Sequence, residues 1–221
     1  MKEIRIYIEG GGNDRLSWRK IRAGFGEFFD PLRQLARSRR IEWSIIPCGS
    51  RNETFEEFRI GLRRHPDAFN VLLVDSESRV ALPRWDHLRR QDLWDIPALH
   101  EDQCHFMVRA IEAWLVADPD AMAGFYGQGF RRNALPRQED VEGVEKDDLM
   151  TAIKNAVKGT NKRTYRKIDH CAELLKRIDR QKVRSRAHHC DLLFNTLEAR
   201  IRGGENLPEQ GHKGQQGQGE P

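Results

Sequence analysis

The sequence predicts an α/β fold in which strands and amphipathic helices alternate along the chain. Residues 4–8 alternate between apolar and polar types, which is typical of a strand with two unlike faces. Residues 69–74 form an unbroken apolar run, which is typical of a buried parallel strand. Residues with helical spacing lie between and after these two segments, so parallel strands joined by helices are expected. A chain of 221 residues is long enough for one such core with a helical extension.

The other elements of the core follow from apolar spacing and from signals for the ends of helices and strands. Trp18, Phe25 and Leu32 recur at helical spacing and predict a long helix after the first strand. Asp118 and Pro119 end the last helix of the core. In order, we expect a helix at Ser17–Ser38, a strand at Ile41–Cys48, a helix at Asn52–His65 capped by Asn52 or Thr54, strands at Phe69–Val74 and Gln103–Val108, and a helix at Arg109–Ala117.

The segment Val80–Glu101 is expected to be an irregular excursion with one helical turn, because prolines at 83 and 97 interrupt it. It contains Trp85 and Trp94. We interpret these side chains as buried anchors of a long loop, with stacking on a nucleic-acid base as the alternative.

The second half of the chain is predicted to be helical. After an irregular connector at 124–146, apolar stripes predict three helices, at 149–157, 174–178 and 193–201. The tail is rich in Gly and Gln without apolar periodicity, which is typical of disorder. The expected organisation is an α/β core at 1–123, a basic helical extension packed on the core at 124–202, and a disordered tail at 203–221.

Composition indicates a globular protein with a charged surface, since 38% of the residues are hydrophobic and 33% are charged. No apolar run approaches the roughly 20 residues that span a bilayer, and the N-terminus lacks the apolar region of a signal peptide. We therefore expect a cytoplasmic protein with no membrane partner. Four scattered cysteines without CxxC spacing favour reduced thiols. A zinc site is the alternative, although paired ligand spacing is missing; its ligands would come from Cys171, Cys190, His170, His188 and His189.

Acidic residues follow the first, third and fourth predicted strands. Glu9 precedes Gly10, Gly11 and Gly12, Asp75 and Glu77 follow the third strand, and Glu112 lies in the first turn of a helix. The carboxyl ends of parallel strands meet at one edge of a sheet, so these acids should converge. Carboxylates without a His or Cys cluster favour magnesium or manganese, which support phosphodiester hydrolysis. Solvated acids, and for Glu112 the helix dipole, are the structural alternatives.

The three glycines would leave the space before this site free of side chains, so that a phosphate can approach. They do not form a P-loop, since no Gly-Lys-Ser/Thr sequence ends the turn. Nor do they have the spacing of a dinucleotide fingerprint.

Basic residues are concentrated in the second half of the chain. Lys154–Arg186 contains twelve lysines or arginines and three acids, which makes DNA or RNA a plausible partner. The loop GTNKRTYRKID supplies Lys162 and Lys167 as candidates to assist catalysis, and a solvated charge run is the alternative. The candidate nucleic-acid-binding residues are Arg109, Lys162, Arg163, Arg166 and Lys167.

The motifs IYIEGGGND, LLVDSES and HFMVRAIEAWLVAD, in this order, resemble the Toprim domain, in particular its version in the small bacterial proteins of domain-of-unknown-function family 4276. The resemblance implies a Toprim-like (Rossmann-like) four-stranded parallel sheet flanked by helices. It also implies that Glu9 acts in acid/base chemistry or metal binding and that Asp75 and Glu77 bind magnesium, with Glu77 one methylene longer than the usual second Asp. Glu112 is similar in placement to a further acid of overcoming-lysogenization-defect nucleases.

The leading functional hypothesis is a magnesium- or manganese-dependent nuclease that uses water as the nucleophile. Relatives of this kind often accompany an ATPase in phage-defence or mobile loci, so an ATPase partner is expected. The alternative is a non-catalytic nucleic-acid-binding or regulatory subunit of an ATPase complex. Phosphoryl transfer on a nucleotide is a third, weaker hypothesis.

Overall fold

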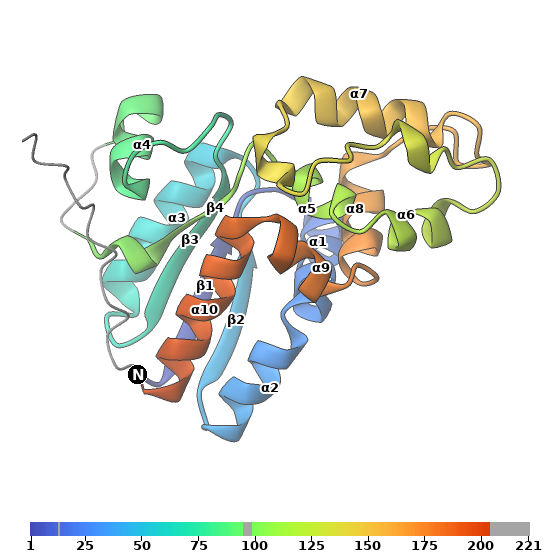
Figure 1. The fold of residues 1–221 in the computed structure, drawn as a ribbon. Helices are drawn as coiled ribbons and strands as arrows, with labels where there is room; N and C mark the ends of the chain where they lie inside the picture. The colour runs from blue at the N-terminus through green and yellow to red at the C-terminus, as the bar shows by residue number, and fades with distance from the viewer. Residues whose placement is uncertain (13, 95–98, 204–221) are drawn as a thin grey trace, which may run out of the picture.

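Four parallel strands form the centre of the protein in a computed structural model that describes residues 1–12, 14–94 and 99–203 (Figure 1). Their order in the sheet is β2-β1-β3-β4. The predicted α/β fold with a four-stranded parallel sheet is therefore confirmed. This order makes β1 and β3 neighbours, so their carboxyl ends lie side by side. The strands are β1 (Glu3–Ile8), β2 (Glu42–Pro47), β3 (Phe69–Asp75) and β4 (Cys104–Met107).

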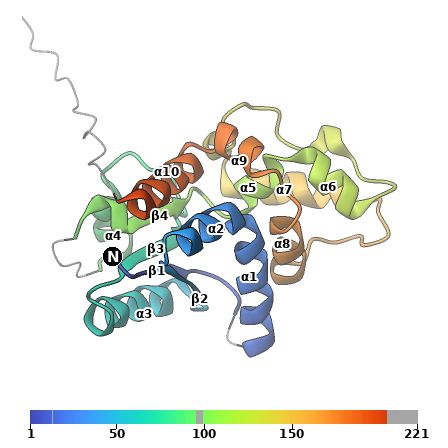
Figure 2. The same cartoon turned by 90° about the horizontal axis from the view of Figure 1, so that it is seen from below.

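Helices cover both faces of the sheet (Figure 2). Ile6 of β1 is fully buried on one face, and Tyr7 is 2% exposed on the other. Both faces of β1 are thus buried, although the alternating sequence predicted two unlike faces. One face packs against α1 (Arg15–Phe28), α2 (Asp30–Ser38) and α10 (His188–Arg202), and the other against α3 (Arg51–Arg64) and α4 (Arg84–Asp92).

The remaining helices lie together beyond one end of the sheet (Figure 1). Helix α8 packs along α1 so closely that a Cβ on Gly24 would lie 2.7 Å from the carbonyl oxygen of Ala172. One hydrophobic cluster runs from β1 through these helices to α10, so the C-terminal half shares the core of the sheet. The helices are α5 (Glu112–Val116), α6 (Pro119–Tyr126), α7 (Lys146–Val157), α8 (Lys167–Leu175) and α9 (Arg180–Arg186).

Two predictions about helix boundaries were wrong. The predicted helix Ser17–Ser38 is divided at Phe29, because Pro31 lies in the first turn of α2 and a proline cannot continue the preceding helix. Helix α3 is capped by Ser50 rather than by Asn52 or Thr54. The Ser50 side chain and the Glu53 side chain form a reciprocal capping box.

Two further segments are more regular than predicted. The excursion after β3 contains the nine-residue helix α4 instead of a single turn. Trp85 is 2% exposed and Trp94 stacks on Phe55 with the ring centroids 4.2 Å apart, so both are anchors of this segment. The C-terminal half contains α9 in addition to the predicted helices, and its connector includes 3-10 turns at Arg132–Ala134 and Val141–Gly143. The helix predicted at 174–178 is misplaced, because α8 begins at Lys167 and ends at Leu175. Proline 97 and the tail from residue 204 lie outside the described residues.

All four cysteines are buried free thiols, as predicted. The burial of the thiols raises their pKa values, because a charged thiolate is unfavourable in an apolar environment.

Among the described residues, none of the helices combines the length and the apolar character needed to cross a bilayer.

Candidate metal centre

The carboxyl ends of β1 and β3 bring Glu9, Asp75 and Glu77 together. The amide of Glu9 donates to the carbonyl of Leu73 at 3.0 Å, which continues the pairing of the two strands. The Glu9 carboxylate then accepts a hydrogen bond from the amide of Asp75 at 3.1 Å. Each of the three acids offers a carboxylate oxygen, and these oxygens all lie within 4.8 Å of one another. We refer to Glu9, Asp75 and Glu77 as the carboxylate cluster.

The turn after Glu9 requires glycine for conformational reasons. Gly10 and Gly11 have φ values of +123° and +92°, which a residue with a side chain rarely adopts. Gly10 pairs with Gly49 after β2 through hydrogen bonds of 2.8 and 3.1 Å. A Cβ on Gly10 would meet nothing within 4 Å, whereas one on Gly11 would lie 2.9 Å from the Trp18 side chain. Open space therefore borders Gly10, and the Gly11 position is restricted by packing as well as by φ.

Asp75 is the most buried member of the cluster, with 3% of its surface exposed. One carboxylate oxygen accepts a hydrogen bond from the amide of Ile111 at 2.9 Å, and the other lies 3.8 Å from the ammonium nitrogen of Lys167. Burial, with a further contribution from the nearby Glu9 charge, raises the pKa of Asp75 to about 8. Burial also raises the pKa of Glu9, although the Arg51 charge opposes this shift. A positive charge at this position would favour the ionised form of both groups.

Glu77 lies in a strained loop at the more open side of the cluster. Its φ of +60° is uncommon for a residue with a side chain, and Arg109 after β4 has a φ of +64°. The two loops are joined because the amide of Arg109 donates to the Ser76 hydroxyl at 2.9 Å. The Glu77 carboxylate accepts from the Lys146 ammonium group at 2.6 Å. These contacts maintain the left-handed conformations of Glu77 and Arg109 and hold Glu77 near Asp75.

Glu112 lies beside the carboxylate cluster rather than within it. It is 1% exposed, and one of its oxygens accepts a hydrogen bond from the Tyr165 hydroxyl at 3.0 Å. Its other oxygen is buried without a hydrogen-bond partner among the described residues. Glu112 directly follows Ile111, whose amide donates to Asp75, and the Glu112 charge contributes to the raised pKa of Asp75. Glu112 therefore adds a fourth carboxyl group to this edge of the sheet, but it is not a member of the carboxylate cluster.

Arg51 is the principal residue of the site that sequence reasoning missed. Its guanidinium group lies 3.4 Å from the Glu9 carboxylate and also donates to the carbonyl of Asp75. Two further hydrogen bonds, of 2.6 and 2.8 Å, join it to Asp92 of α4. Arg51 follows β2 at the same edge of the sheet, so the reasoning that identified acids at strand ends would also have identified this cation.

The predicted basic residues occupy different environments. Lys167 lies against Asp75, and the charges of Asp75, Glu112 and Glu9 outweigh its burial and raise its pKa. Lys162 instead donates to the carbonyl of Phe125 at 2.9 Å and lies over the Phe125 ring. Arg109 is only 7% exposed and pairs with Glu145, so the prediction of a surface contact with nucleic acid does not fit its position. Arg163 is exposed, and Arg166 lies 3.3 Å from Asp169.

The zinc alternative does not fit the structure. Nδ1 of His170 shares a hydrogen bond with the Tyr126 hydroxyl at 3.0 Å, and Nδ1 of His189 lies 2.8 Å from the Glu142 carboxylate. These two histidines therefore already have partners other than a cysteine. Within the described residues, the carboxylate cluster is the one group of three or more His, Cys, Asp or Glu side chains with ligand atoms close together. Its oxygen-only donors suit a hard divalent cation such as magnesium or manganese.

The sequence profile of the family described as "Domain of unknown function (DUF4276)" matches residues 8–198. The chain belongs to the DUF4276 family. The matched region of this DUF4276 chain contains the whole carboxylate cluster, Arg51, Lys146 and Lys167. No curated protein and no solved structure matches the chain.

Proposed function

We propose that this DUF4276 protein is a Toprim-type nuclease that hydrolyses phosphodiester bonds of DNA or RNA in the cytoplasm with magnesium or manganese. The observation that carries the proposal is the carboxylate cluster, in which three acids from two strand ends present oxygens within 4.8 Å of one another. Both the resemblance of the motifs to Toprim domains and the parallel sheet support this assignment.

The donor set fits a divalent cation. Glu9, Asp75 and Glu77 would hold it, and the unpartnered buried oxygen of Glu112 adds acidic character beside them. Concentrating these acids in a partly buried space is unfavourable unless positive charge compensates them. When bound, the metal would supply a more acidic water and neutralise negative charge on the phosphate.

The side chains of the chain itself orient the acids. Arg51 and the amide of Asp75 fix the Glu9 carboxylate, and the amide of Ile111 fixes the Asp75 carboxylate. The Lys167 side chain is 56% exposed, so its ammonium group can turn from Asp75 to a phosphate oxygen of the substrate. A cation in that position stabilises the negative charge that develops on the phosphate during hydrolysis.

Lys146 and Lys167 do not prevent a metal from binding. Their side chains are 32% and 56% exposed, and each makes a single ion pair with the carboxylate cluster. A partly exposed pair such as Lys146–Glu77 contributes about 0 to 1 kcal/mol, and the pair of Lys167 with the buried Asp75 is long, at 3.8 Å. A divalent cation with several carboxylate ligands would offset that loss, so the lysines can exchange places with it.

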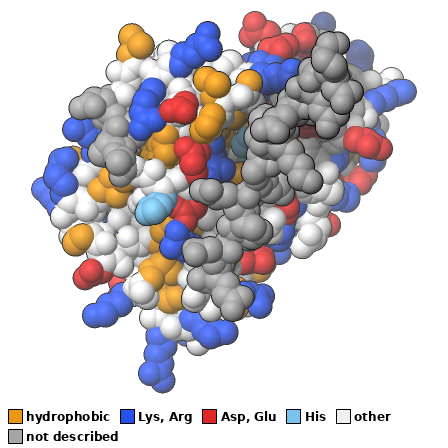
Figure 3. Space-filling model, turned by 60° about the vertical axis from the view of Figure 1, so that its left-hand side comes forward, with side chains coloured by type: hydrophobic (Ala, Val, Ile, Leu, Met, Phe, Trp, Pro, Cys, Tyr) orange, Lys and Arg blue, Asp and Glu red, His pale blue; other side chains and the backbone are white. Residues whose placement is uncertain are grey.

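A second candidate is a non-catalytic nucleic-acid-binding or regulatory subunit of an ATPase complex in a phage-defence or mobile locus. The observation that favours it is the pairing of every acid of the carboxylate cluster with a cation, Arg51, Lys146 or Lys167, because ion pairs can also serve structure alone. On the face shown in Figure 3, Lys and Arg side chains are scattered among other residues rather than gathered in one patch.

A cleavage assay distinguishes the two candidates. Single-stranded DNA, double-stranded DNA and RNA are incubated with the purified protein in Mg²⁺, in Mn²⁺ and in EDTA. We expect metal-dependent cleavage that Asp75→Asn abolishes and Glu173→Gln leaves unchanged, since Glu173 is an exposed acid of α8 paired with Lys176. Cleavage that persists in Asp75→Asn would refute the assignment. Salt-sensitive binding without cleavage would support the regulatory subunit.

A further inference from the structure

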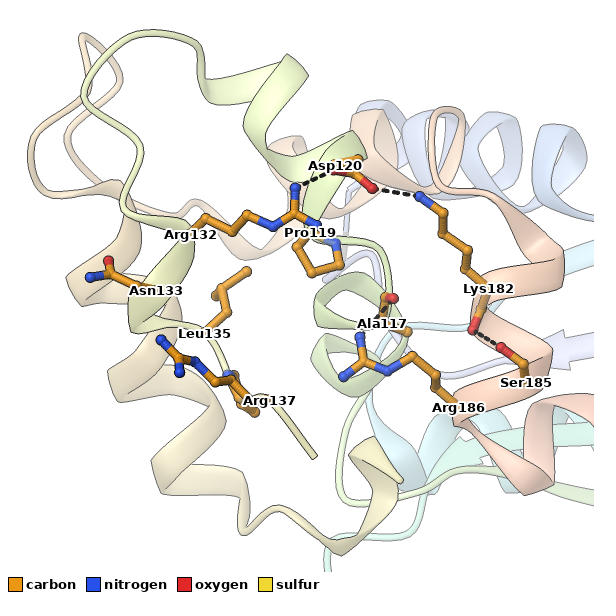
Figure 4. Close-up of a pocket in the computed structure, with 11 residues that line it drawn as sticks. Ala117, Pro119, Asp120, Arg132, Asn133, Leu135, Arg137, Lys182, Ser185 and Arg186 are labelled. Atoms are coloured by element: carbon orange, nitrogen blue, oxygen red, sulfur yellow. Dashed lines mark hydrogen bonds and ion pairs between the residues drawn. The ribbon is translucent and has the colours of Figure 1, made fainter. Parts of the chain in front are cut away.

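A basic cavity lies in the C-terminal half of the chain, outside the carboxylate cluster (Figure 4). Its volume is about 600 Å³. The segment after α6 lines one side and α9 lines the other, with the start of α6 between them (Figure 4). None of the residues that line it belongs to the carboxylate cluster or pairs with one of its acids. The lining residues with polar side chains are Asp120, Arg132, Asn133, Arg137, Lys182, Ser185 and Arg186.

Positive charge exceeds negative charge in this cavity. Lys182 lies 2.7 Å from Asp120 and 3.0 Å from the buried Asp118, and Arg132 also pairs with Asp120. These two carboxylates compensate two of the four cations that line the cavity. The other two, Arg137 and Arg186, have no carboxylate partner among the described residues.

Arg186 is fixed in place without being neutralised. Its guanidinium nitrogens donate to the carbonyl oxygens of Ala117 at 2.9 Å and Gln138 at 2.6 Å, with longer contacts to Val116 and Glu139. Carbonyl groups carry no net charge, so the positive charge of Arg186 remains uncompensated beside the cavity. The same contacts tie the segment at 138–139 to the end of α5 and give the cavity a rigid wall.

Arg137 is exposed on the opposite side, and its guanidinium group makes no hydrogen bond or ion pair with the described residues. A free guanidinium presents two parallel N–H donors, which match two oxygens of a phosphate group. Asn133 and the Ser185 hydroxyl are additional polar groups of the lining. Apolar surface from Leu135 and Pro136 completes that wall.

We propose that this cavity binds a phosphate group, carried either by a small phosphorylated ligand or by the backbone of a nucleic acid. Arg137 provides the free donor pair, and the fixed charge of Arg186 attracts the anion from the facing side. The site does not depend on the carboxylate cluster, so it does not require the proposed nuclease activity.

Isothermal titration calorimetry with the full chain in EDTA tests this proposal. The probes are pyrophosphate, a short single-stranded DNA and malonate, a dicarboxylate without phosphate. We expect Arg137→Gln to weaken the binding of the phosphate probe by about tenfold. Arg131→Gln is the matched control, because Arg131 is an exposed neighbour outside the lining, and it should change binding by less than about twofold.

The outcomes separate the two sources of phosphate. Binding of pyrophosphate that Arg137→Gln weakens assigns the site to a small phosphorylated ligand, and selective loss of DNA binding assigns it to nucleic acid. The titrations are made in EDTA, where no metal-dependent cleavage occurs, so their result is separate from the outcome of the cleavage assay. Equal effects of Arg137→Gln and Arg131→Gln, tighter binding of malonate, or no binding of either phosphate probe would overturn the proposal.

Discussion

Neutralising Asp75 should stabilise the metal-free protein at alkaline pH. The pKa of Asp75 is about 8 in the folded chain, whereas its usual value is 3.8, because the folded protein buries the carboxylate beside Glu9. The folded state therefore holds this proton more tightly than the unfolded chain does. Stability must fall as the pH rises from about 4 to about 8, and the contribution of Asp75 is constant above that range.

The size of the effect follows from the shift. About four pH units at ~1.4 kcal/mol each give a destabilisation on the order of 6 kcal/mol at high pH. Asp75→Asn removes this term. The attraction of Lys167 is already included in it, because the Lys167 charge opposes the rise of the Asp75 pKa. The asparagine carbonyl can still accept the hydrogen bond from the amide of Ile111.

Thermal unfolding in EDTA measures the prediction. Asp75→Asn should raise Tm by on the order of 10 °C near pH 8 and by far less near pH 4, close to the usual pKa of Asp75, where the unfolded chain has only begun to release the proton that the folded chain retains. Glu173→Gln, on the surface of α8, should differ little from the wild type at either pH. An Asp75→Asn variant that is less stable than the wild type near pH 8, or a Tm difference independent of pH, would show that burial does not destabilise the ionised Asp75 carboxylate.

Three further predictions concern packing and charge. Arg51→Met should lower the free energy of unfolding in chemical denaturation by about 3 kcal/mol, because it leaves Asp92 and Glu9 partly buried without their cation. Lys146→Met should lower it by less than about 1 kcal/mol, and equal losses in the two variants would argue against a buried role for Arg51. Gly24→Ala should destabilise the protein, because the added Cβ would collide with the backbone of Ala172, whereas Gly26→Ala, whose Cβ meets nothing within 4 Å, should stabilise it by about 0.5 to 1 kcal/mol. If Gly24→Ala stabilised the protein in the same measurement, the close packing of α1 on α8 would be contradicted. In a cleavage assay of the proposed nuclease, Lys167→Met should lower kcat by about a hundredfold and Lys162→Met by less than about twofold. A larger loss in Lys162→Met would contradict the assignment of Lys167 as the cation that contacts the phosphate.

The sequence was sufficient to predict the edge of the sheet at which the acids meet. Glu9 and Asp75 each follow an apolar strand, and parallel strands place such residues on one edge whatever the details of packing. Glu112 shows the limit of this reasoning. Its position at the start of α5 was predictable, but its direction depends on how that helix leaves β4, and the structure turns one of its oxygens toward Tyr165.

The cations were harder to predict than the acids. Lys162 and Lys167 are close in sequence, and only the packing of α8, which begins at Lys167, against α1 brings Lys167 to Asp75 while Lys162 contacts Phe125. Lys146 approaches Glu77 across a long connector, and no local pattern specifies such a distant contact. Pro31, in contrast, carried a usable signal, since a proline in a predicted helix marks a break.

The most direct test of the proposed metal centre is the anomalous diffraction of crystals grown with Mn²⁺. We predict a strong peak among the carboxylates of Glu9, Asp75 and Glu77, with the ammonium groups of Lys146 and Lys167 displaced from them. The absence of a peak there, with all three acids still paired to Arg51, Lys146 and Lys167, would contradict it. In that case the cluster would be a network of ion pairs rather than a metal site.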